Sequence, residues 1–116
     1  MALYVASAFS LNMLDFSSHV TLCVQSVDLD TARNMLRNNN FVSAVGHQGT
    51  ADFLSKLTGV SVPFNRAAVK LHDGDSVLVF QLTTRLEEGK VLSEKEVMDM
   101  YNAGAAKFYL VSVGPC

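Results

Sequence analysis

The run Val77–Leu82 (VLVFQL) constrains the fold more than any other segment of the chain. Its first four residues are all apolar, so a strand formed here has two faces to bury instead of one. Short runs of this kind are typical of central strands that other layers of the protein cover on both sides. The remaining residues must therefore supply the neighbouring strands and the elements that cover them.

Five other segments have the β-branched and aromatic content of strands. They are residues 2–8, 20–27, 41–45, 67–71 and 107–113. The pair Asp73-Gly74 is one that two-residue hairpin turns favour. We therefore expect residues 67–71 to pair antiparallel with a strand over residues 76–82.

Three helices are expected between these strands. Asp28 is placed as the N-cap of the first helix, and the three Asn residues at 38–40 are expected to end it because Asn tolerates the left-handed conformation. The second helix follows residues 46–50. Ser93 and Glu96 have the spacing of a capping box, which predicts the start of the third helix.

Length and element order together predict a single α/β domain over residues 1–116, with a mixed sheet of five or six strands and about three helices. Nine Lys and Arg against eleven Asp and Glu give a formal net charge of -2. Proteins that coat nucleic acid through its phosphates are usually strongly basic, so we expect a local site with few phosphate contacts and no extended duplex as partner.

No apolar run reaches the roughly 18 residues that a membrane helix needs. The N-terminal segment is apolar, but it lacks the basic residues that begin a signal peptide. We therefore expect no membrane partner and a cytoplasmic location.

Cys23 and Cys116 are far apart in the sequence. For an intracellular chain the expectation is two free thiols. A disulfide stays open as the alternative, because proteins of hyperthermophilic archaea form them inside cells.

The histidines, His19, His47 and His72, do not have the spacing of metal ligands, and the sequence contains no Cys-x-x-Cys. We expect no metal and no other cofactor. His19 and His72 are interpreted as ordinary surface residues.

His47 lies between Gly46 and Gly49, where a buried strand leads into a helix. Free backbone N–H groups and the positive end of the helix dipole favour an anion there, and the glycines let a phosphate come close to the backbone. An imidazole at this point could donate a proton to a departing oxygen. The alternative is that His47 only caps the helix.

Arg85 and Glu88 belong to a polar loop that follows the central strand. Ligand sites of α/β sheets favour the carboxyl ends of strands, and Arg binds phosphate well. The alternative is a solvated charged turn. Arg66 opens the strand expected at 67–71 and is either a second anion contact or an exposed strand end.

Ser10 and Asn12 alternate with apolar residues in the loop after the first strand, so we expect both side chains to face the same way. A loop of this kind can present hydrogen bonds to a ligand from a fixed base. The alternative is that these groups bond to their own backbone.

Four segments taken together resemble a family of small proteins from viruses of hyperthermophilic archaea. They are AFSLNML at 8–14, SAVGH at 43–47, NRAAVKL at 65–71 and RLEEGKVL at 85–92. The members of this family are viral ring nucleases, which act as anti-CRISPR proteins against type III systems. The resemblance extends from the first strand to the last.

The resemblance implies binding of cyclic tetra-adenylate and its cleavage, without metal, to linear di-adenylate that ends in a 2′,3′-cyclic phosphate. It implies that His47 is the general acid and that Arg85 and Glu88 form the catalytic loop pair. Substrate contacts would come from Ser10, Asn12, Gly46 and Arg66.

A ligand with four equivalent nucleotides can lie on a two-fold axis, so we expect a homodimer that acts in the cytoplasm of an infected host cell. One alternative is a non-catalytic dimeric protein that binds nucleic acid and regulates viral or host genes. Another is a protein that binds the cyclic messenger without cutting it.

Overall fold

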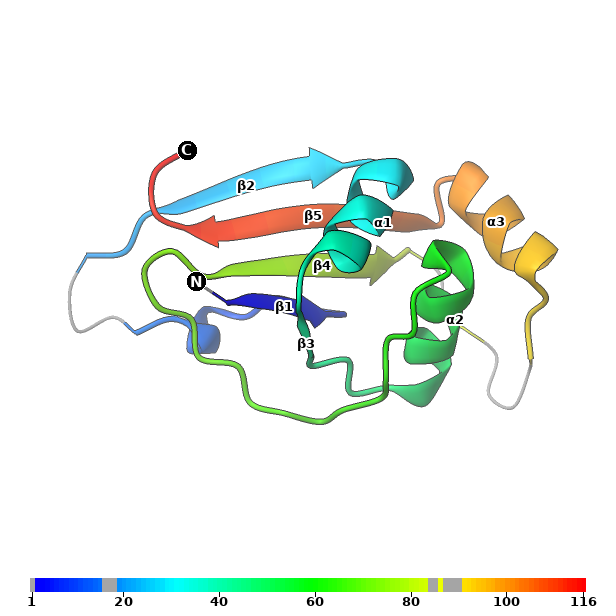
Figure 1. The fold of residues 1–116 in the computed structure, drawn as a ribbon, viewed down its shortest axis with the longest axis horizontal. Helices are drawn as coiled ribbons and strands as arrows, with labels where there is room; N and C mark the ends of the chain where they lie inside the picture. The colour runs from blue at the N-terminus through cyan, green and yellow to red at the C-terminus, as the bar shows by residue number, and fades with distance from the viewer. Residues whose placement is uncertain (1, 16–18, 84–85, 87–90) are drawn as a thin grey trace.

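Five strands form one mixed sheet, with the apolar run at its centre (Figure 1). The structure is a computed structural model, and it describes residues 2–15, 19–83, 86 and 91–116. The strands are β1 (Leu3–Ala6), β2 (Leu22–Val27), β3 (Val42–Ser43), β4 (Ser76–Leu82) and β5 (Ala106–Val113). Their order across the sheet is β2-β5-β4-β1-β3.

Parallel and antiparallel pairs coexist in this sheet. β1 runs parallel to β3 and β4, whereas β5 runs antiparallel to β4 and β2. The predicted α/β domain with a mixed sheet and three helices is confirmed, with five strands. The central position predicted for residues 77–82 is confirmed as well.

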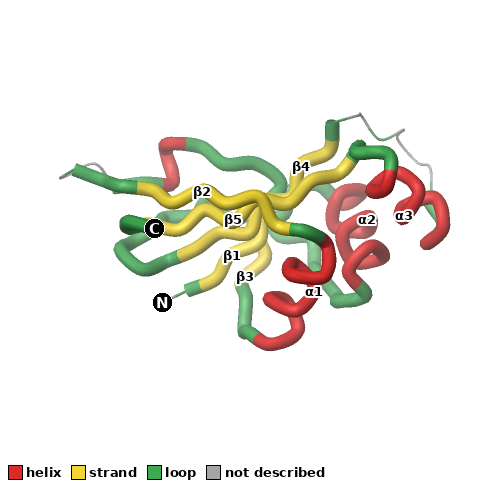
Figure 2. The backbone as a smooth tube through the Cα atoms, turned by 90° about the horizontal axis from the view of Figure 1, so that it is seen from above, coloured by secondary structure: helices red, strands yellow, loops and turns green. Residues whose placement is uncertain are grey.

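Three helices cover one face of the sheet (Figure 2). They are α1 (Leu29–Asn38), α2 (Gln48–Thr58) and α3 (Glu94–Asn102). Phe80 of β4 carries much of this contact, since its ring centroid lies 5.6 Å from that of Phe53 in α2 and 5.1 Å from that of Phe108 in β5. Tilted aromatic pairs at such distances stabilise a core beyond the area they bury.

The opposite face of the sheet is covered by irregular chain. Val77 and Val79 of β4 point to this side and pack in a second core with Leu14, Val69 and Leu71. The 3₁₀ helix η1 (Leu11–Met13) precedes Leu14 and lies across the sheet from α1 (Figure 2). β4 is therefore buried on both faces, as its composition predicts.

The hairpin predicted around Asp73-Gly74 is wrong. The turn itself exists, with Gly74 at a φ of 87°, but residues 67–71 form no strand. Both edges of β4 are occupied by β1 and β5, so no backbone groups remain for residues 67–71 to pair with. That segment instead makes one isolated bridge between Leu71 and Leu14.

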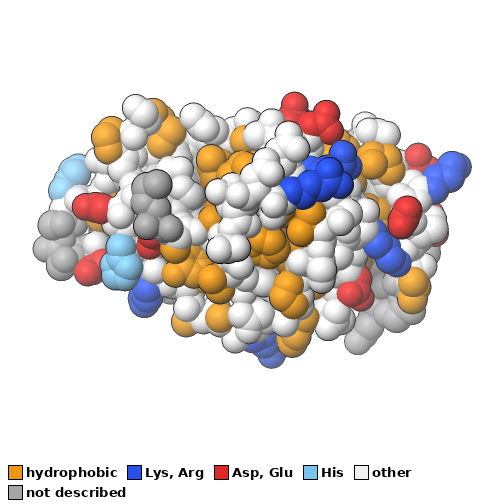
Figure 3. All heavy atoms as spheres, in the orientation of Figure 1, with side chains coloured by type: hydrophobic (Ala, Val, Ile, Leu, Met, Phe, Trp, Pro, Cys, Tyr) orange, Lys and Arg blue, Asp and Glu red, His pale blue; other side chains and the backbone are white. Residues whose placement is uncertain are grey.

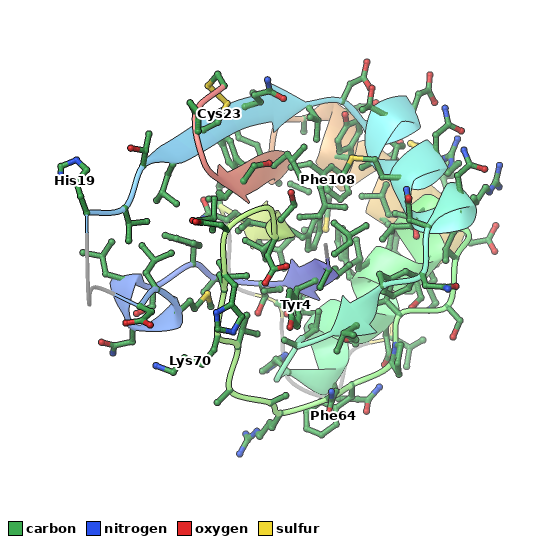
Figure 4. All side chains as sticks on the ribbon, turned by 60° about the vertical axis from the view of Figure 1, so that its left-hand side comes forward. Tyr4, His19, Cys23, Phe64, Lys70 and Phe108 are labelled. Atoms are coloured by element: carbon green, nitrogen blue, oxygen red, sulfur yellow. A yellow bond between two sulfur atoms is a disulfide. The ribbon has the colours of Figure 1, made fainter. Side chains whose placement is uncertain are left out.

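The expectation of free thiols is also wrong. Cys23 and Cys116 form a disulfide with an S–S distance of 2.11 Å (Figure 4). Antiparallel pairing sets Cys23 opposite Ser112, and the chain then turns back at Gly114, where φ is 130°. The two Cα atoms are thereby brought to 5.0 Å although 93 positions separate them in sequence.

The predicted N-caps are confirmed. The Asp28 carboxylate accepts a hydrogen bond from the Thr31 N–H, and Ser93 with Glu96 makes both bonds of the capping box. The expected end of α1 is wrong in its mechanism, since Asn39 is extended at a φ of -131° and its side chain donates to the carbonyl of Met35. Among the described residues, no helix is long and apolar enough to cross a membrane.

Candidate functional site

The candidate site is built where β3 leads into α2. Ser43 ends β3, Val45 is fully buried, and the chain then passes through Gly46 and His47 into the helix. β1, β3 and β4 run parallel, so the segments that follow them leave the same edge of the sheet. The carboxyl edge of parallel strands is the usual place for a ligand in α/β proteins.

His47 is the N-cap of α2. Its backbone is extended (φ -137°, ψ 122°), and its Nδ1 accepts a hydrogen bond from the Thr50 N–H over 3.4 Å. The capping interpretation of His47 is therefore correct as far as it goes. It accounts for only one ring nitrogen, because His47 is exposed and its Nε2 has no hydrogen-bond partner within the described residues.

Arg66 contacts Gly46, the residue before His47. Its Nε donates to the carbonyl of Gly46 over 3.2 Å, and a Cβ added to Gly46 would stand 3.3 Å from Arg66 Cγ. The missing side chain of Gly46 thus makes room for the stem of Arg66. The sequence left the role of Arg66 open, and the structure attaches its Nε to the backbone of the residue before His47.

A short stretch of paired chain holds Arg66 in place. Phe64 and Val45 form a parallel bridge, and the Asn65 N–H donates to the carbonyl of Val45 over 2.9 Å. The Asn65 side chain also donates to the carbonyl of Ser43. Residues 64–66 therefore run alongside the segment that carries His47 and are hydrogen-bonded to it.

Leu86, which follows β4 in the sequence, lies near the same helix end. A Cβ added to Gly49 would lie 3.2 Å from His47 Cε1 and 3.8 Å from a methyl carbon of Leu86. Leu86 therefore packs beside the first turn of α2. Arg85 and Glu88, which flank it in the sequence, lie outside the described residues.

Both ends of the loop between β4 and α3 are attached to neighbouring elements. The Thr83 N–H donates to the carbonyl of Ala105 over 2.8 Å, at the start of β5. The Lys56 ammonium of α2 donates to the carbonyl of Leu92, just before α3.

Ser10 and Asn12 lie elsewhere. Both belong to the turn of η1, where Ser10 Oγ accepts from the Asn12 N–H over 3.2 Å and the carbonyl of Asn12 accepts from Lys70 Nζ over 2.7 Å. Figure 1 shows η1, the short blue coil, and α2 toward opposite ends of the long axis. In the described part of the chain, no hydrogen bond joins either residue to His47 or Arg66.

The prediction that the Ser10 and Asn12 side chains face the same way is wrong. Alternation along an extended loop would point both side chains the same way, but a 3₁₀ helix advances by three residues per turn. Ser10 is its N-cap and Asn12 its second residue, so they do not share a face. Ser10 also serves its own backbone, as the alternative interpretation proposed.

Basic side chains do not gather into one patch on the face that Figure 3 shows. Lys and Arg are separated there by apolar, neutral and acidic groups. Among the described residues, no three His, Cys, Asp or Glu side chains are grouped closely enough to hold a metal ion.

A cavity of about 670 Å³ opens at another place, between the ends of β2 and β5 and the helices α1 and α3. Ser26, Asp28, Lys107 and Tyr109 are among the residues that line it. None of the residues predicted for the site lines this cavity.

Comparison with known proteins gives consistent matches along the chain. The profile of the STIV B116-like family matches residues 3–109. Uncharacterized protein 26 of Sulfolobus islandicus filamentous virus is 34% identical over 110 residues, which cover 95% of this chain and 92% of that protein. The uncharacterized protein ORF116 of Acidianus filamentous virus 1 is 34% identical over 113 residues, 97% of each chain.

A solved structure has the same fold. B116 of Sulfolobus turreted icosahedral virus superposes with a TM-score of 0.83 at 35% identity, covering 97% of this chain and 99% of that one. Sequence and fold thus agree over nearly the whole length. This chain belongs to the STIV B116-like family.

Proposed function

We propose that this protein is a metal-independent ring nuclease. It binds cyclic tetra-adenylate and cuts it to linear di-adenylate with a 2′,3′-cyclic phosphate, which removes the second messenger of type III CRISPR defence in the cytoplasm of an infected cell. The observation that carries the proposal is the exposed His47 at the start of α2, whose Nε2 has no hydrogen-bond partner among the described residues; Arg66 donates to Gly46, the residue before it.

The cleavage step needs few groups from the protein. The ribose 2′-oxygen attacks the adjacent phosphorus and loses its proton to solvent, a new P–O2′ bond forms, and the P–O5′ bond breaks. Protonated His47 gives its Nε2 proton to the leaving 5′-oxygen. Arg66 offsets the negative charge that grows on the phosphate.

The first turn of α2 adds a second favourable interaction with phosphate. The N–H groups of Gln48 and Gly49 precede the hydrogen-bonded part of the helix and have no acceptor within the described residues. Free N–H groups and the helix dipole stabilise an anion at such an end. Gly49 has no side chain to keep the phosphate away from this backbone.

The remaining predicted residues receive roles by the family resemblance. Arg85 would contact phosphate, and Glu88 would orient Arg85 or the reacting ribose. Ser10 and Asn12 lie toward the other end of the molecule from His47, so the proposal assigns them to a nucleotide other than the one being cut.

The proposal includes a homodimer. A two-fold axis through the ring gives one His47 to each side, and two opposite cuts yield two identical dinucleotides. Exposed apolar side chains that the subunit contact could use lie on the edge strands, with Val24 61% exposed in β2 and Val42 49% exposed in β3. Light scattering at micromolar concentration should give twice the chain mass, with one ring bound per two chains; a monomer, or one ring per chain, contradicts the shared site.

The activity is tested by incubating labelled cyclic tetra-adenylate with the protein in EDTA and separating the products. Wild-type protein should yield the linear dinucleotide. His47→Ala should bind the ring but lose about a hundredfold to ten-thousandfold in single-turnover rate. His19→Ala, the exposed histidine of another segment, should cleave as the wild type does.

The other outcomes separate the alternatives. Tight binding of an intact ring would identify a protein that sequesters the messenger. Retention of duplex DNA in a gel shift, with no affinity for the ring, would favour the nucleic-acid-binding regulator.

A further inference from the structure

A buried hydroxyl touches the His47 ring from within the first turn of α2. Thr50 is only 9% exposed, and its Oγ1 lies 3.5 Å from His47 Nδ1. The Thr50 N–H approaches the same nitrogen over 3.4 Å. Within the described residues, the Thr50 hydroxyl makes no other hydrogen bond.

The two groups of Thr50 suit different states of the imidazole. The N–H can only donate, so it pairs with Nδ1 while that nitrogen carries a lone pair. A protonated ring has an N–H at Nδ1, which needs an acceptor. The hydroxyl both donates and accepts, so it alone of the two can bond to the ring in either state.

General-acid chemistry requires the protonated state of the His47 ring. The ring that gives up its Nε2 proton is the imidazolium, and the neutral ring left behind still carries its proton on Nδ1. The helix cap seen with Nδ1 as acceptor must therefore be exchanged for a bond in which Nδ1 donates. Thr50 Oγ1 is the acceptor already in place for it.

We propose that Thr50 is a positioning residue for His47: its hydroxyl accepts the Nδ1–H of the protonated ring and keeps Nε2–H directed outward. The catalytic part of this inference rests on the proposed function, whereas the hydrogen bond does not. Two charged side chains bond to the sequence neighbours of His47, since Asp52 of α2 accepts from Gln48 and Arg66 donates to Gly46.

Three substitutions isolate the hydroxyl. Thr50→Val removes it at nearly constant shape, and Thr50→Ser keeps it. Thr58→Val is the matched control, because Thr58 is a fully buried threonine at the other end of α2 whose hydroxyl donates to Leu54. Thr50→Ala gives a second hydroxyl-free protein should the valine variant fail to fold.

The first readout needs no ligand. NMR of ¹⁵N-labelled protein, at a pH where His47 is protonated, should show a slowly exchanging Nδ1–H in the wild type, Thr50→Ser and Thr58→Val. The signal should be lost in Thr50→Val. A protected Nδ1–H that persists without the hydroxyl would overturn the proposal.

The second readout is single-turnover cleavage of cyclic tetra-adenylate. Thr50→Val should be slower by about ten- to hundredfold, the worth of a hydrogen bond to a charged group, with unchanged affinity for the ring. Thr50→Ser should restore the rate, and Thr58→Val should keep it even if the protein is less stable. If Thr50→Val cleaves the ring as fast as the wild type does, the positioning role is overturned. If neither the wild type nor any variant cleaves the ring, the proposed function is overturned. The NMR result then still decides whether the hydrogen bond exists.

Discussion

His47 caps α2, and in the proposed mechanism it also serves as the general acid. Its Nδ1 caps α2 through the Thr50 N–H, so the ring orientation is tied to the helix. Its Nε2 stays available to a ligand. A ring that is already held at Nδ1 loses little conformational entropy when Nε2 contacts the transition state. This small entropy loss favours general-acid catalysis.

Arg66 gives the most specific test among single residues. Arg66→Ala should slow cleavage of the ring by about ten- to hundredfold, because a charge aimed at the phosphate is lost. Arg66→Lys should recover only part of the rate, since Lys lacks the Nε that donates to Gly46. The measurement is the single-turnover rate at saturating protein.

The control for this test is Arg37→Ala, which removes an exposed cation from the last turn of α1. It should leave the rate unchanged. Equal rates for Arg66→Ala and the wild type would show that Arg66 is only an exposed residue and takes no part in cleavage.

The sequence could identify His47 but not the role of Arg66. Glycine on both sides of a histidine at the start of a helix is a local signal, readable from adjacent residues. The place of Arg66 depends on the bridge between Phe64 and Val45 and on a carbonyl 20 positions away. No local pattern encodes such a contact, so the sequence could not place Arg66, and its role as an anion contact remains a proposal.

Among the helices and strands, features that depend on residues close together in the sequence were predicted correctly. The continuous apolar run set β4 at the centre, and the caps at Asp28 and Ser93 set the starts of α1 and α3. The failed hairpin shows the limit of this reasoning. Asp73-Gly74 does form a turn, but the neighbours of β4 are decided by β1 and β5, which lie far away in the sequence.

The turn before β4 predicts a pH dependence of stability. Asp75 is 7% exposed, and its carboxylate accepts hydrogen bonds from the N–H groups of His72 and Ala2, each over 2.9 Å. Burial alone would raise the pKa of Asp75, but these bonds and the charge of His72 outweigh it and hold the pKa below its usual value. A lowered folded-state pKa means that the charged form stabilises the protein.

The contribution of Asp75 to the free energy of unfolding should therefore be fully present above the usual pKa range of Asp and be lost as the pH drops through the lowered pKa. Asp75→Asn should cost about 1–3 kcal/mol at neutral pH and make acid unfolding less steep. Denaturant titrations across the acid range measure both effects. Asp73→Asn, at an exposed position of the same turn, is the control and should behave like the wild type.

At the scale of the whole molecule, the disulfide joins the two ends of a long stretch of sequence. It fastens the segment after β5 to the edge strand β2. Cys23 and Cys116 are 93 positions apart, and their approach depends on the register of β2 with β5. The sequence alone does not reveal this register, so the prediction relied on composition and the expected cell compartment, which favoured free thiols.

Reducing this bond should lower the free energy of unfolding by about 2–4 kcal/mol, because the unfolded chain regains the freedom that a long closed loop removes. Thermal unfolding with and without reductant measures the loss. The double variant Cys23→Ser, Cys116→Ser should match the reduced protein and show no response to reductant. A wild-type protein that is equally stable in both conditions would contradict a structural role for the bond.

In the proposed reaction the ribose 2′-oxygen of the substrate is the nucleophile and His47 is the general acid. The most direct measurement is mass spectrometry of the products formed from cyclic tetra-adenylate in EDTA and heavy-oxygen water. We expect a linear dinucleotide with a 2′,3′-cyclic phosphate that carries no heavy oxygen, because the attacking oxygen belongs to the substrate. Heavy oxygen in the phosphate of the first product, or a ring that stays intact, would contradict it.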